Sequence, residues 1–474
     1  MTPVTCMAGR RVALFGLGGS GLATAAALLA GGAQVDVWDD NVRAREQAAA
    51  TGLHVYDLVS AEWRTYDALV LAPGVPLTHP APHWTVTRAR AAGVEVIGDI
   101  ELFCRERDVL APDSPFIAIT GTNGKSTTTA LIAHILKQAG ADVQLGGNIG
   151  TPILALEPPA DNRFHVIEVS SFQIDLSLTL NPSVGIMLNL SPDHIDRHGS
   201  VERYAAVKER LVQQAQIAIV GVDDRMTWEI GECRLEENRD LNDRPTIAIS
   251  GIRELKRGVF ARNGQIVSTL LDGGERVLCD LAGVNSLRGA HNAQNAAAAA
   301  ACVDLWTFED GVINKGVLTF SGLPHRLEEV GRAGQVLFIN DSKATNADAA
   351  ARALSSFSAI YWIAGGRAKE GGAESLVPLM DNVRKAYLIG EAADDFTATL
   401  EGATETQICG TLERAVEEAF RAAREDDAAE VAVLLSPACA SYDQFTNYES
   451  RGDKFRSLAR SLPGVDSVGP AGQA

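Results

Sequence analysis

Short apolar runs alternate with longer stretches of helical periodicity along most of the chain. The runs at 11–15 and 336–340 precede stretches with helical spacing at 22–30 and 347–354, and a further apolar run occupies 431–435. Regular alternation of this kind is typical of parallel sheets covered by helices. The pattern therefore predicts an α/β protein whose ligands bind beyond the carboxyl ends of the strands.

Two Pro- and Gly-containing stretches, at 111–115 and 322–324, divide the chain into thirds. A length of 474 residues also favours three domains, because one domain takes about 150 residues. We therefore predict domains at 1–111, 112–323 and 324–474.

The sequence GTNGKSTT at 121–128 joins the apolar run 116–119 to a segment of helical spacing. Lys125 and Ser126 are thus expected at a helix N-terminus, where backbone N–H groups and the helix dipole attract phosphates. Lys125 would reach the outer phosphates of a nucleoside triphosphate, and Ser126 would offer its hydroxyl to magnesium. Ile119 stands where a strict Walker A box has glycine. The alternative is a Gly-rich turn with a solvated lysine.

Gly16, Gly18 and Gly21 form a second glycine loop between an apolar run and a helical segment. Acidic residues such as Asp39 follow at the spacing of a dinucleotide-binding fingerprint. The loop could bind NAD or another nucleotide that carries a diphosphate. Alternatively, it is a tight strand-to-helix turn without a ligand.

Polar residues also follow other predicted strands. Glu168 ends the run 164–168, and Asn189, Asp193 and His194 follow the run at 184–188. Oxygen and imidazole ligands at neighbouring strand ends suit Mg²⁺ or Mn²⁺ beside a triphosphate. In the last third, cations and hydroxyls at such places could hold an amino acid with more than one carboxylate. They are Arg326, Lys343, Thr345, Lys369 and Ser441.

Composition narrows the classes of function. The formal net charge of -18, without a Lys and Arg cluster, argues against a nucleic-acid partner. The seven cysteines form no CxxC pair, which suits a reducing cytosol. No stretch has the roughly 18 uninterrupted apolar residues of a membrane helix. We expect a cytoplasmic protein without a membrane partner.

Several motifs, in order, resemble those of the Mur ligases of peptidoglycan synthesis. They are GTNGKST, EVSSFQ, NLSPDHIDRH, YAAVK, LRGAHNAQN, LPHR, NDSKATN and SPACASYDQF, which spread from 121 to 445. The last two resemble the members that add D-glutamate. The resemblance implies a Rossmann-like UDP-binding first domain, a central P-loop ATPase domain with a largely parallel sheet, and a Rossmann-like third domain.

The resemblance also implies the reaction. ATP would phosphorylate the carboxylate of UDP-N-acetylmuramoyl-L-alanine, and the amine of D-glutamate would attack the acyl phosphate. The implied cofactors are ATP and Mg²⁺ at two sites, with Mn²⁺ as a substitute, and we expect a monomer.

The resemblance implies a role for each matching residue. Lys125, Glu168, His194 and Lys208 would be catalytic, and Ser126, Glu168, His194 and a carbamylated Lys208 would hold the metals. The pattern alone predicts Lys208 as an exposed helical lysine. The ATP site would comprise Gly121, Thr122, Asn123, Gly124, Lys125, Ser126, Thr127, Asn292, Asn295, Arg326 and Asp341. The UDP-substrate site would comprise Gly16, Gly18, Gly21, Asp39, Gly74, Asn148 and Ser170. The D-glutamate site would comprise Lys343, Thr345, Lys369, Ser441 and Tyr448.

Two positions depart from the family pattern. Tyr448 stands where a phenylalanine is expected, and Arg367-Ala368 precedes Lys369 where an acidic residue is usual. An aromatic wall is kept at 448, so we expect D-glutamate to be retained, while the role of Lys369 is left open. The alternatives are a Mur-type ligase for another amino acid, an NAD-dependent oxidoreductase, and a nucleotide-binding regulatory module without turnover.

Overall fold

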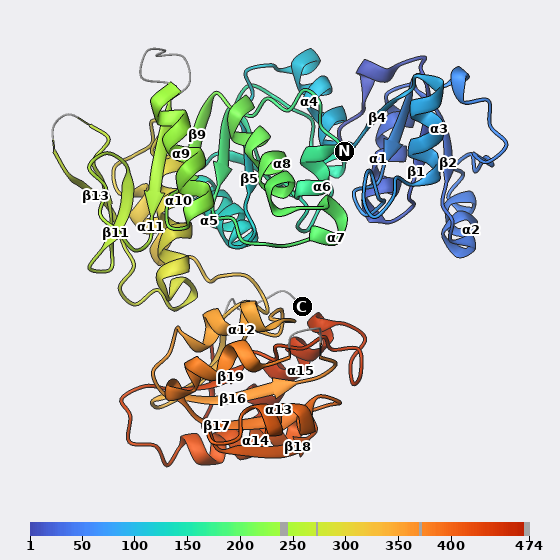
Figure 1. The fold of residues 1–474 in the computed structure, drawn as a ribbon. Coiled ribbons are helices and arrows are strands. Elements are labelled where there is room, and N and C mark those ends of the chain that lie inside the picture. Colours follow the sequence, from blue (N-terminus) through green and yellow to red (C-terminus); the bar gives the residue numbers. More distant parts are fainter. Residues whose placement is uncertain (238–244, 272–273, 369–371, 469–474) are drawn as a thin grey trace. The chain divides into compact units, whose positions relative to one another are not determined.

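A computed structural model describes residues 1–237, 245–271, 274–368 and 372–468, and in 234–237 the backbone alone. The chain divides into two units, which are described separately. Unit 1 comprises Met1–Ala282 and Asn292–Leu318, and unit 2 comprises Gly283–His291 and Thr319–Ala474. Figure 1 shows the ribbon coloured along the sequence.

The first part of unit 1 is built on a four-stranded parallel sheet in the order β2-β1-β3-β4. Residues from its strands are buried in two apolar clusters, which also include α1 and α3 respectively. The elements are η1 (Thr5–Met7), β1 (Arg11–Phe15), α1 (Gly19–Ala30), β2 (Gln34–Trp38), α2 (Val42–Ala50), η2 (Trp63–Thr65), β3 (Ala68–Leu71), α3 (Trp84–Ala92), β4 (Glu95–Ile97) and α4 (Asp99–Leu110).

The rest of unit 1 is built on a nine-stranded sheet in the order β13-β12-β11-β10-β9-β8-β5-β7-β6. Its strands pair in parallel except for β11 with β12 and β12 with β13. The elements are β5 (Phe116–Thr120), α5 (Lys125–Gln138), β6 (Asp142–Gly147), η3 (Ile153–Ala155), β7 (Arg163–Glu168), α6 (Ser171–Asp175), β8 (Val184–Met187), α7 (Ile195–His198), α8 (Val201–Gln214), β9 (Ile217–Gly221), α9 (Arg225–Glu237), β10 (Thr246–Ser250), β11 (Val259–Arg262), β12 (Gln265–Ser268), β13 (Arg276–Asp280), α10 (Ala290–Val303, which starts in unit 2) and α11 (Val312–Leu318).

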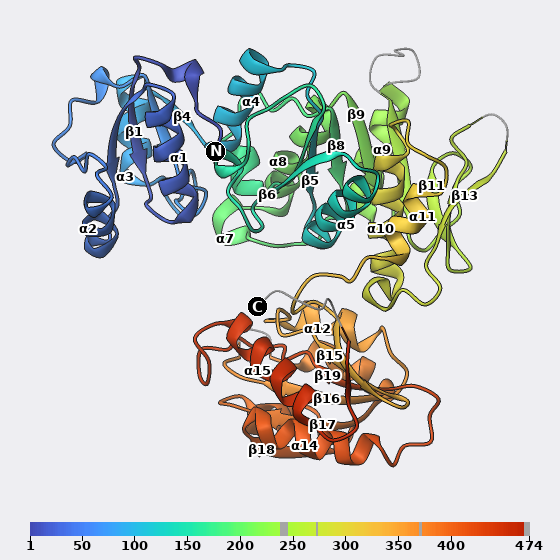
Figure 2. The same cartoon turned by 180° about the vertical axis from the view of Figure 1, so that it is seen from behind.

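Helices cover both faces of the nine-stranded sheet. Helix α8 lies in front of the sheet in Figure 1, and α5 lies in front of it in the reverse view of Figure 2. Strand β5 is buried at every position and is flanked by β7 and β8. Its carboxyl end leads into the loop at 121–124, which precedes α5 and is called the phosphate loop below.

Unit 2 contains a seven-stranded sheet in the order β18-β17-β16-β19-β15-β14-β20. Only the pairs that involve β14 are antiparallel among its described strands. One apolar cluster includes α12, η5 and α13, and a second includes α14 and α15. The elements are η4 (Asn285–Leu287), β14 (Glu328–Ala333), β15 (Val336–Asn340), α12 (Ala347–Leu354), β16 (Ile360–Gly365), η5 (Glu374–Asn382), β17 (Val383–Ile389), α13 (Ala393–Thr399), β18 (Thr406–Gly410), α14 (Leu412–Ala423), β19 (Val431–Leu435), α15 (Tyr448–Ser461) and β20 (Asp466–Ser467).

The predicted α/β architecture with largely parallel sheets is confirmed. The apolar runs 11–15, 336–340 and 431–435 are strands β1, β15 and β19, and the helical pattern at 347–354 is α12. The boundaries after 111 and 323 stay a prediction.

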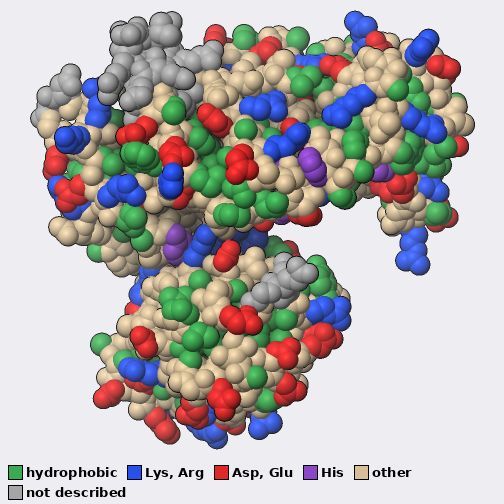
Figure 3. All heavy atoms as spheres, in the orientation of Figure 1, with side chains coloured by type: hydrophobic (Ala, Val, Ile, Leu, Met, Phe, Trp, Pro, Cys, Tyr) green, Lys and Arg blue, Asp and Glu red, His purple; other side chains and the backbone are tan. Residues whose placement is uncertain are grey.

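The surface carries both signs of charge. In Figure 3, Lys and Arg side chains are interspersed with Asp and Glu over the visible face. None of the helices in the described residues is both long enough and apolar enough to span a membrane.

Candidate functional site

The loop between β5 and α5 depends on two glycines with left-handed backbone. Gly121 has φ 144° and Gly124 has φ 84°, values that residues with a Cβ rarely adopt. A Cβ on Gly124 would also lie 2.3 Å from the Asn295 Oδ1 atom. The loop can therefore make its tight turn beneath α10 only with glycine at 124.

Lys125 begins helix α5, as the sequence predicted, and its side chain folds back over the loop. Its Nζ atom donates to the carbonyl oxygens of Gly121 and Thr122, each at 2.8 Å. Ser126 and Thr127 follow in the first turn and are buried. The amine, the hydroxyls and the helix N-terminus together form an anion-binding geometry.

Neighbouring strand ends hold this loop in place. The backbone N–H of Asn123 donates to Asn189 Oδ1 at 2.9 Å, and Asn189 Nδ2 donates to the Asn123 carbonyl at 3.1 Å. The Thr122 hydroxyl donates to the Ser191 carbonyl and lies 3.1 Å from the Tyr204 hydroxyl. The loop is therefore fixed by the segment after β8 and by α8.

Lys208 on α8 lies against the same loop and is only 2% exposed, so the expectation of an exposed lysine is wrong. Its Nζ atom donates to Thr120 Oγ1 at 3.0 Å and to the Gly121 carbonyl at 2.9 Å. Burial, followed by the nearby charge of Lys125, lowers the pKa of Lys208 well below its usual value. Lys208 lies on the buried stripe of α8, at helical spacing from Tyr204 and Leu211. That spacing is a sequence signal for burial, and the prediction of an exposed lysine overlooked it.

Glu168 ends β7 with a carboxylate that is 3% exposed. Its Oε1 atom accepts a hydrogen bond from Asn148 Nδ2 at 2.8 Å. Its Oε2 atom is buried and has no hydrogen-bond partner among the described residues. A buried carboxylate oxygen without a donor suits a cation ligand, because unpaired buried charge is costly.

His194 precedes α7 with a left-handed backbone, φ 52°, and its side chain is half exposed. Its ring packs on Phe172, with centroids 5.1 Å apart. In the described part of the chain, no hydrogen bond or ion pair joins His194 to Glu168 or Lys208. No group of three or more His, Cys, Asp and Glu side chains suited to a metal gathers among these residues either. A metal held here would need the Ser126 hydroxyl, or an oxygen added to Lys208, beside Glu168.

Two asparagines of α10 lie against the phosphate loop. Asn295 Oδ1 accepts from Thr128 Oγ1 at 3.2 Å, and Asn295 Nδ2 donates to Asn292 Oδ1 at 3.0 Å. Both asparagines are buried. The structure thus brings these two predicted ATP-site residues to the start of α5.

The glycine loop after β1 is a tight strand-to-helix turn. Gly16 has φ 100°, and a Cβ on Gly21 would lie 1.8 Å from the Gly16 carbonyl oxygen. Asp39 Oδ2 accepts from the Leu17 backbone N–H at 2.7 Å, so this carboxylate braces the loop. Gly18 is the residue that precedes α1.

Gly74 and Ser170 lie on two other segments of unit 1. The Gly74 carbonyl accepts from Arg197 Nη1 at 3.0 Å, which joins it to the segment that carries His194. Ser170 caps α6, and its hydroxyl and Gln173 form a reciprocal capping box.

In unit 2, the turn around Arg326 is strained. His325 and Leu327 on either side have φ values of 62° and 45°, in the left-handed region. Such conformations persist where the surroundings enforce them, and they concentrate at functional sites. Asp341 is buried against this turn and accepts from the Leu327 N–H at 3.3 Å and from Ser436 Oγ at 2.8 Å. Burial raises the pKa of Asp341 to about 7.

The predicted D-glutamate residues of unit 2 lie on three segments. Lys343 Nζ lies 5.6 Å from the centre of the Tyr448 ring, and the Thr345 N–H donates to the Lys343 carbonyl at 2.8 Å. Ser441 is buried beyond β19. Lys369 lies outside the described residues. Arg367 pairs with Glu391 at 3.1 Å, and both side chains are more than half exposed.

Arg451 in α15 escaped the sequence analysis. It is fully buried and donates to the Cys439 carbonyl and to the Ser342 carbonyl and hydroxyl. It thereby ties the segment of Lys343 to the segment of Ser441. The one available signal is its spacing of four and eight residues from Phe455 and Ala459, which share the buried face of α15.

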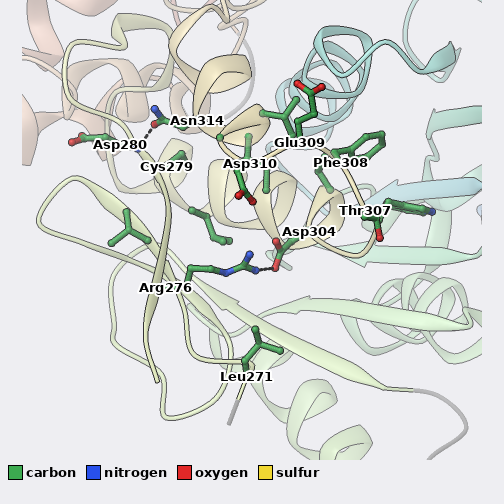
Figure 4. Close-up of a pocket in the computed structure, with 17 residues that line it drawn as sticks. Leu271, Arg276, Cys279, Asp280, Asp304, Thr307, Phe308, Glu309, Asp310 and Asn314 are labelled. Atoms are coloured by element: carbon green, nitrogen blue, oxygen red, sulfur yellow. Dashed lines mark hydrogen bonds and ion pairs between the residues drawn. The ribbon is translucent and has the colours of Figure 1, made fainter. Parts of the chain in front are cut away.

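A hollow of about 770 Å³ lies elsewhere in unit 1, between β13 and the segment that leads into α11. Figure 4 shows the ion pair of Arg276 with Asp304 in this hollow, and Asn314 Oδ1 accepting from the Asp280 N–H at 2.9 Å. None of the predicted site residues lines it. The β5–α5 loop and its phosphate-binding geometry are therefore separate from this hollow.

Three family descriptions match successive parts of the chain. Residues 10–98 match "Mur ligase MurD-like, N-terminal domain", and residues 119–303 match "Mur ligase middle domain". Residues 325–439 match "Mur ligase, glutamate ligase domain".

Curated relatives match over nearly the full length. A protein of Nitrobacter hamburgensis is 55% identical over 99% of this chain and 100% of its own length. A protein of Agrobacterium fabrum is 56% identical over 100% of both chains. Each is named UDP-N-acetylmuramoylalanine--D-glutamate ligase.

Solved structures share the fold. The UDP-N-acetylmuramate-alanine ligase MurC of Thermotoga maritima has a TM-score of 0.55 at 18% identity, covering 95% of this chain and 99% of its own. MurF of Acinetobacter baumannii has a TM-score of 0.55 at 20% identity, covering 96% of this chain and 93% of its own.

Proposed function

This chain belongs to the Mur ligase family, and from that premise we propose that it joins D-glutamate to UDP-N-acetylmuramoyl-L-alanine at the expense of ATP. The name shared by relatives about 55% identical over the whole chain supports this substrate pair. The product would be a peptidoglycan precursor. The geometry that carries the proposal is the pair of amines, Lys125 and Lys208, on the carbonyl of Gly121.

The reaction requires activation of a carboxylate. A carboxylate oxygen of the muramoyl-alanine attacks the γ-phosphorus of ATP, and ADP leaves with the electron pair of the broken P–O bond. The D-glutamate amine then attacks the acyl carbon, phosphate leaves, and the amine loses a proton as the amide forms. The protein's contribution is placement and charge neutralisation, as is general for phosphoryl transfer.

The phosphate loop supplies the first part of that contribution. Lys125 would leave the carbonyls of Gly121 and Thr122 to bind the outer phosphates, while the N–H groups at the start of α5 bind the others. Asn292 and Asn295 adjoin this loop and are the proposed adenine contacts. Arg326 and Asp341, which belong to unit 2, are further proposed ATP contacts.

Mur ligases use ATP with Mg²⁺, and the residues beside the loop fit this cation. The buried Oε2 atom of Glu168 and the Ser126 hydroxyl are hard oxygen donors, and His194 adds an imidazole. When bound, Mg²⁺ would neutralise charge that develops on the transferred phosphoryl group. Two cation sites, with Mn²⁺ as a substitute, belong to the proposal.

Lys208 would complete the second site as a carbamate. Its lowered pKa leaves a larger share of the amine neutral, and the neutral amine can attack CO₂ and release a proton. The N–C bond forms as one N–H bond of the amine and one C=O π bond of CO₂ break, and the product is an anion with two oxygens. This change replaces a buried amine beside Lys125 with an anionic oxygen ligand for Mg²⁺.

The remaining proposed sites hold the other two substrates. The glycine loop of Gly16, Gly18 and Gly21, braced by Asp39, would bind the UDP diphosphate. Gly74, Asn148 and Ser170 would lie along the muramoyl-alanine. Lys343, Thr345, Lys369, Ser441 and Tyr448 would bind D-glutamate. A monomer in the cytoplasm is part of the same proposal.

Phosphate release tests the proposal. The protein is mixed with ATP, Mg²⁺ and UDP-N-acetylmuramoyl-L-alanine, and D-glutamate, L-glutamate, L-alanine and diaminopimelate are added in turn. We expect D-glutamate to give the fastest release. Faster turnover with another amino acid would reject the proposed specificity.

Two controls separate the remaining alternatives. Tight NADH binding without affinity for the UDP-substrate would favour an oxidoreductase. Nucleotide binding without phosphate release under any of the four amino acids would favour a regulatory module.

A further inference from the structure

Asp99, the first residue of α4, is a buried carboxylate that joins two remote segments of unit 1. Its Oδ2 atom accepts a hydrogen bond from Ser20 Oγ at 2.7 Å, in the first turn of α1. Both carboxylate oxygens lie 3.3 Å from Gln173 Nε2 in α6. Asp99 is therefore the direct link between the end of the glycine loop and α6.

Gln173 continues this link to Ser170. Its Oε1 atom accepts from the Ser170 N–H at 3.1 Å and lies 3.2 Å from the Ser170 hydroxyl. Ser170 in turn follows Glu168 by two residues. A continuous chain of hydrogen bonds thus runs from the glycine loop to the strand end that carries Glu168.

The start of α4 packs closely against the segment that follows α6. A Cβ on Gly98 would lie 2.9 Å from Leu176 Cβ, and the Gly98 N–H donates to the Leu176 carbonyl at 3.0 Å. Glu101, one turn further on, accepts from the N–H groups of Leu178 and Thr179 at 2.7 and 2.8 Å. The separation between the glycine loop and Ser170 is therefore set by α4.

We propose that Asp99 is a positioning residue that fixes the distance between the site for the UDP diphosphate and the site for the carboxylate to be phosphorylated. This inference rests on the proposed function, which places the two ends of one substrate at these two segments. A substrate whose ends bind together gains affinity only if the two sites keep the matching separation. Asp99 acts through Ser20 and Gln173 and does not itself touch the reacting atoms.

The bonds of Asp99 predict how substitutions should rank. Asn in Asp99→Asn can still accept from the Ile100 N–H and Gln173, and its Nδ2 atom can donate to the Ser20 hydroxyl, which can rotate to accept. Burial already raises the pKa of Asp99, so a neutral side chain suits the position. Asp99→Ala and Ser20→Ala remove the link from opposite sides.

The chain offers a matched control on the same helix. Glu106, at the far end of α4, is also a buried carboxylate, and it accepts from Thr5 Oγ1 at 2.6 Å. Thr5→Val removes the hydroxyl that bonds Glu106, just as Ser20→Ala removes the hydroxyl that bonds Asp99. None of the residues assigned to a substrate contacts Thr5 or Glu106 among the described hydrogen bonds.

Calorimetric titration of the full chain with UDP and with UDP-N-acetylmuramoyl-L-alanine measures the effect. The Kd of UDP divided by the Kd of UDP-N-acetylmuramoyl-L-alanine reports how much affinity the substrate gains when both of its ends bind. We expect this ratio to fall about tenfold in Ser20→Ala and in Asp99→Ala, which is the scale of one hydrogen bond to a charged group. Thr5→Val and Asp99→Asn should keep the ratio within about twofold of the parent.

An unchanged ratio in Ser20→Ala would overturn the inference, even if Asp99→Ala fails to fold. A ratio in Asp99→Asn as low as that in Asp99→Ala would also overturn it, because charge rather than the link would then matter. If the parent protein itself binds UDP-N-acetylmuramoyl-L-alanine no more tightly than UDP, the proposed function fails instead.

Discussion

Lys208 in unit 1 and Arg451 in unit 2 are both fully enclosed cations, but the chemistry of their side chains separates their roles. Each donates to backbone carbonyl oxygens of loops that carry predicted site residues. Burial lowers the pKa of Lys208 well below its usual value, whereas it lowers the pKa of Arg451 only to about 10. At neutral pH the arginine therefore keeps its charge.

The two side chains differ in what they can do once they are buried. A guanidinium presents a fixed fork of donors, so Arg451 can bond Ser342 and Cys439 at once and hold two loops together. An amine that loses its proton becomes a nucleophile, so Lys208 is suited to covalent modification. Burial thus makes one cation a structural tie and the other a reactive group.

Replacing Lys208 should have the largest effect. Lys208→Ala removes the amine that would carry the carbamate, and Lys208→Arg replaces it with a group that keeps its proton. We expect turnover in the phosphate-release assay to fall at least about 100-fold in both, since a metal contributes several kcal/mol of charge stabilisation. Bicarbonate should restore neither variant, and short carboxylic acids should restore Lys208→Ala in part.

Lys137, exposed near the end of α5, provides the control, and Lys137→Ala should keep parental turnover. Full activity of Lys208→Ala without any added acid would reject the carbamate.

Replacing Arg451 should affect stability more than chemistry. Arg451→Met leaves the buried carbonyls of Cys439 and Ser342 without this donor, at a cost of about 1–3 kcal/mol each in the free energy of unfolding. We expect a lower melting temperature and a raised KM for D-glutamate, with the KM for ATP less affected. Calorimetric melting and initial rates measure both.

Arg460 on the same helix is the matched control. It also donates to backbone carbonyls, those of Val330 and Val468, but it is exposed. Arg460→Met should lose less than half the stability lost by Arg451→Met. Equal losses would mean that burial does not distinguish the two arginines.

Some elements around these two residues could be predicted from the sequence. Hydrophobic periodicity predicted β1, β15 and α12, because these elements bury a regular set of apolar side chains. The phosphate loop was predictable because local glycine and lysine spacing encodes it. The start of α5 at Lys125 bears this out.

Long-range packing of polar side chains was not predictable. Lys208 is buried only because α8 docks beside β5, and Arg451 only because α15 packs against the segments at 342 and 439. Asp99 likewise gains its role from Ser20 and Gln173, which are 79 and 74 residues away in the sequence. Helical spacing places Lys208 and Arg451 on the buried faces of α8 and α15, but it does not identify the remote groups that each side chain contacts.

Asp341 gives a stability effect that appears only as a dependence on pH, and a substitution at Arg451 should shift it slightly. Burial raises the pKa of Asp341 to about 7, against about 3.9 for an unfolded chain. Between these values the folded protein binds a proton that the unfolded chain has released, so stability falls as pH rises from about 4 to 7. The slope is at most about 1.4 kcal/mol per pH unit. Asp341→Asn should remove this fall in stability between about pH 4 and 7, which calorimetric melting at a series of pH values measures. Hydrogen bonds from Ser436 and Leu327, and then the charges of Arg326 and Arg451, hold the Asp341 pKa down, so Arg451→Met should extend the falling slope slightly to higher pH. If the falling slope ends at the same pH in Arg451→Met as in the parent protein, the charge of Arg451 does not affect the pKa of Asp341.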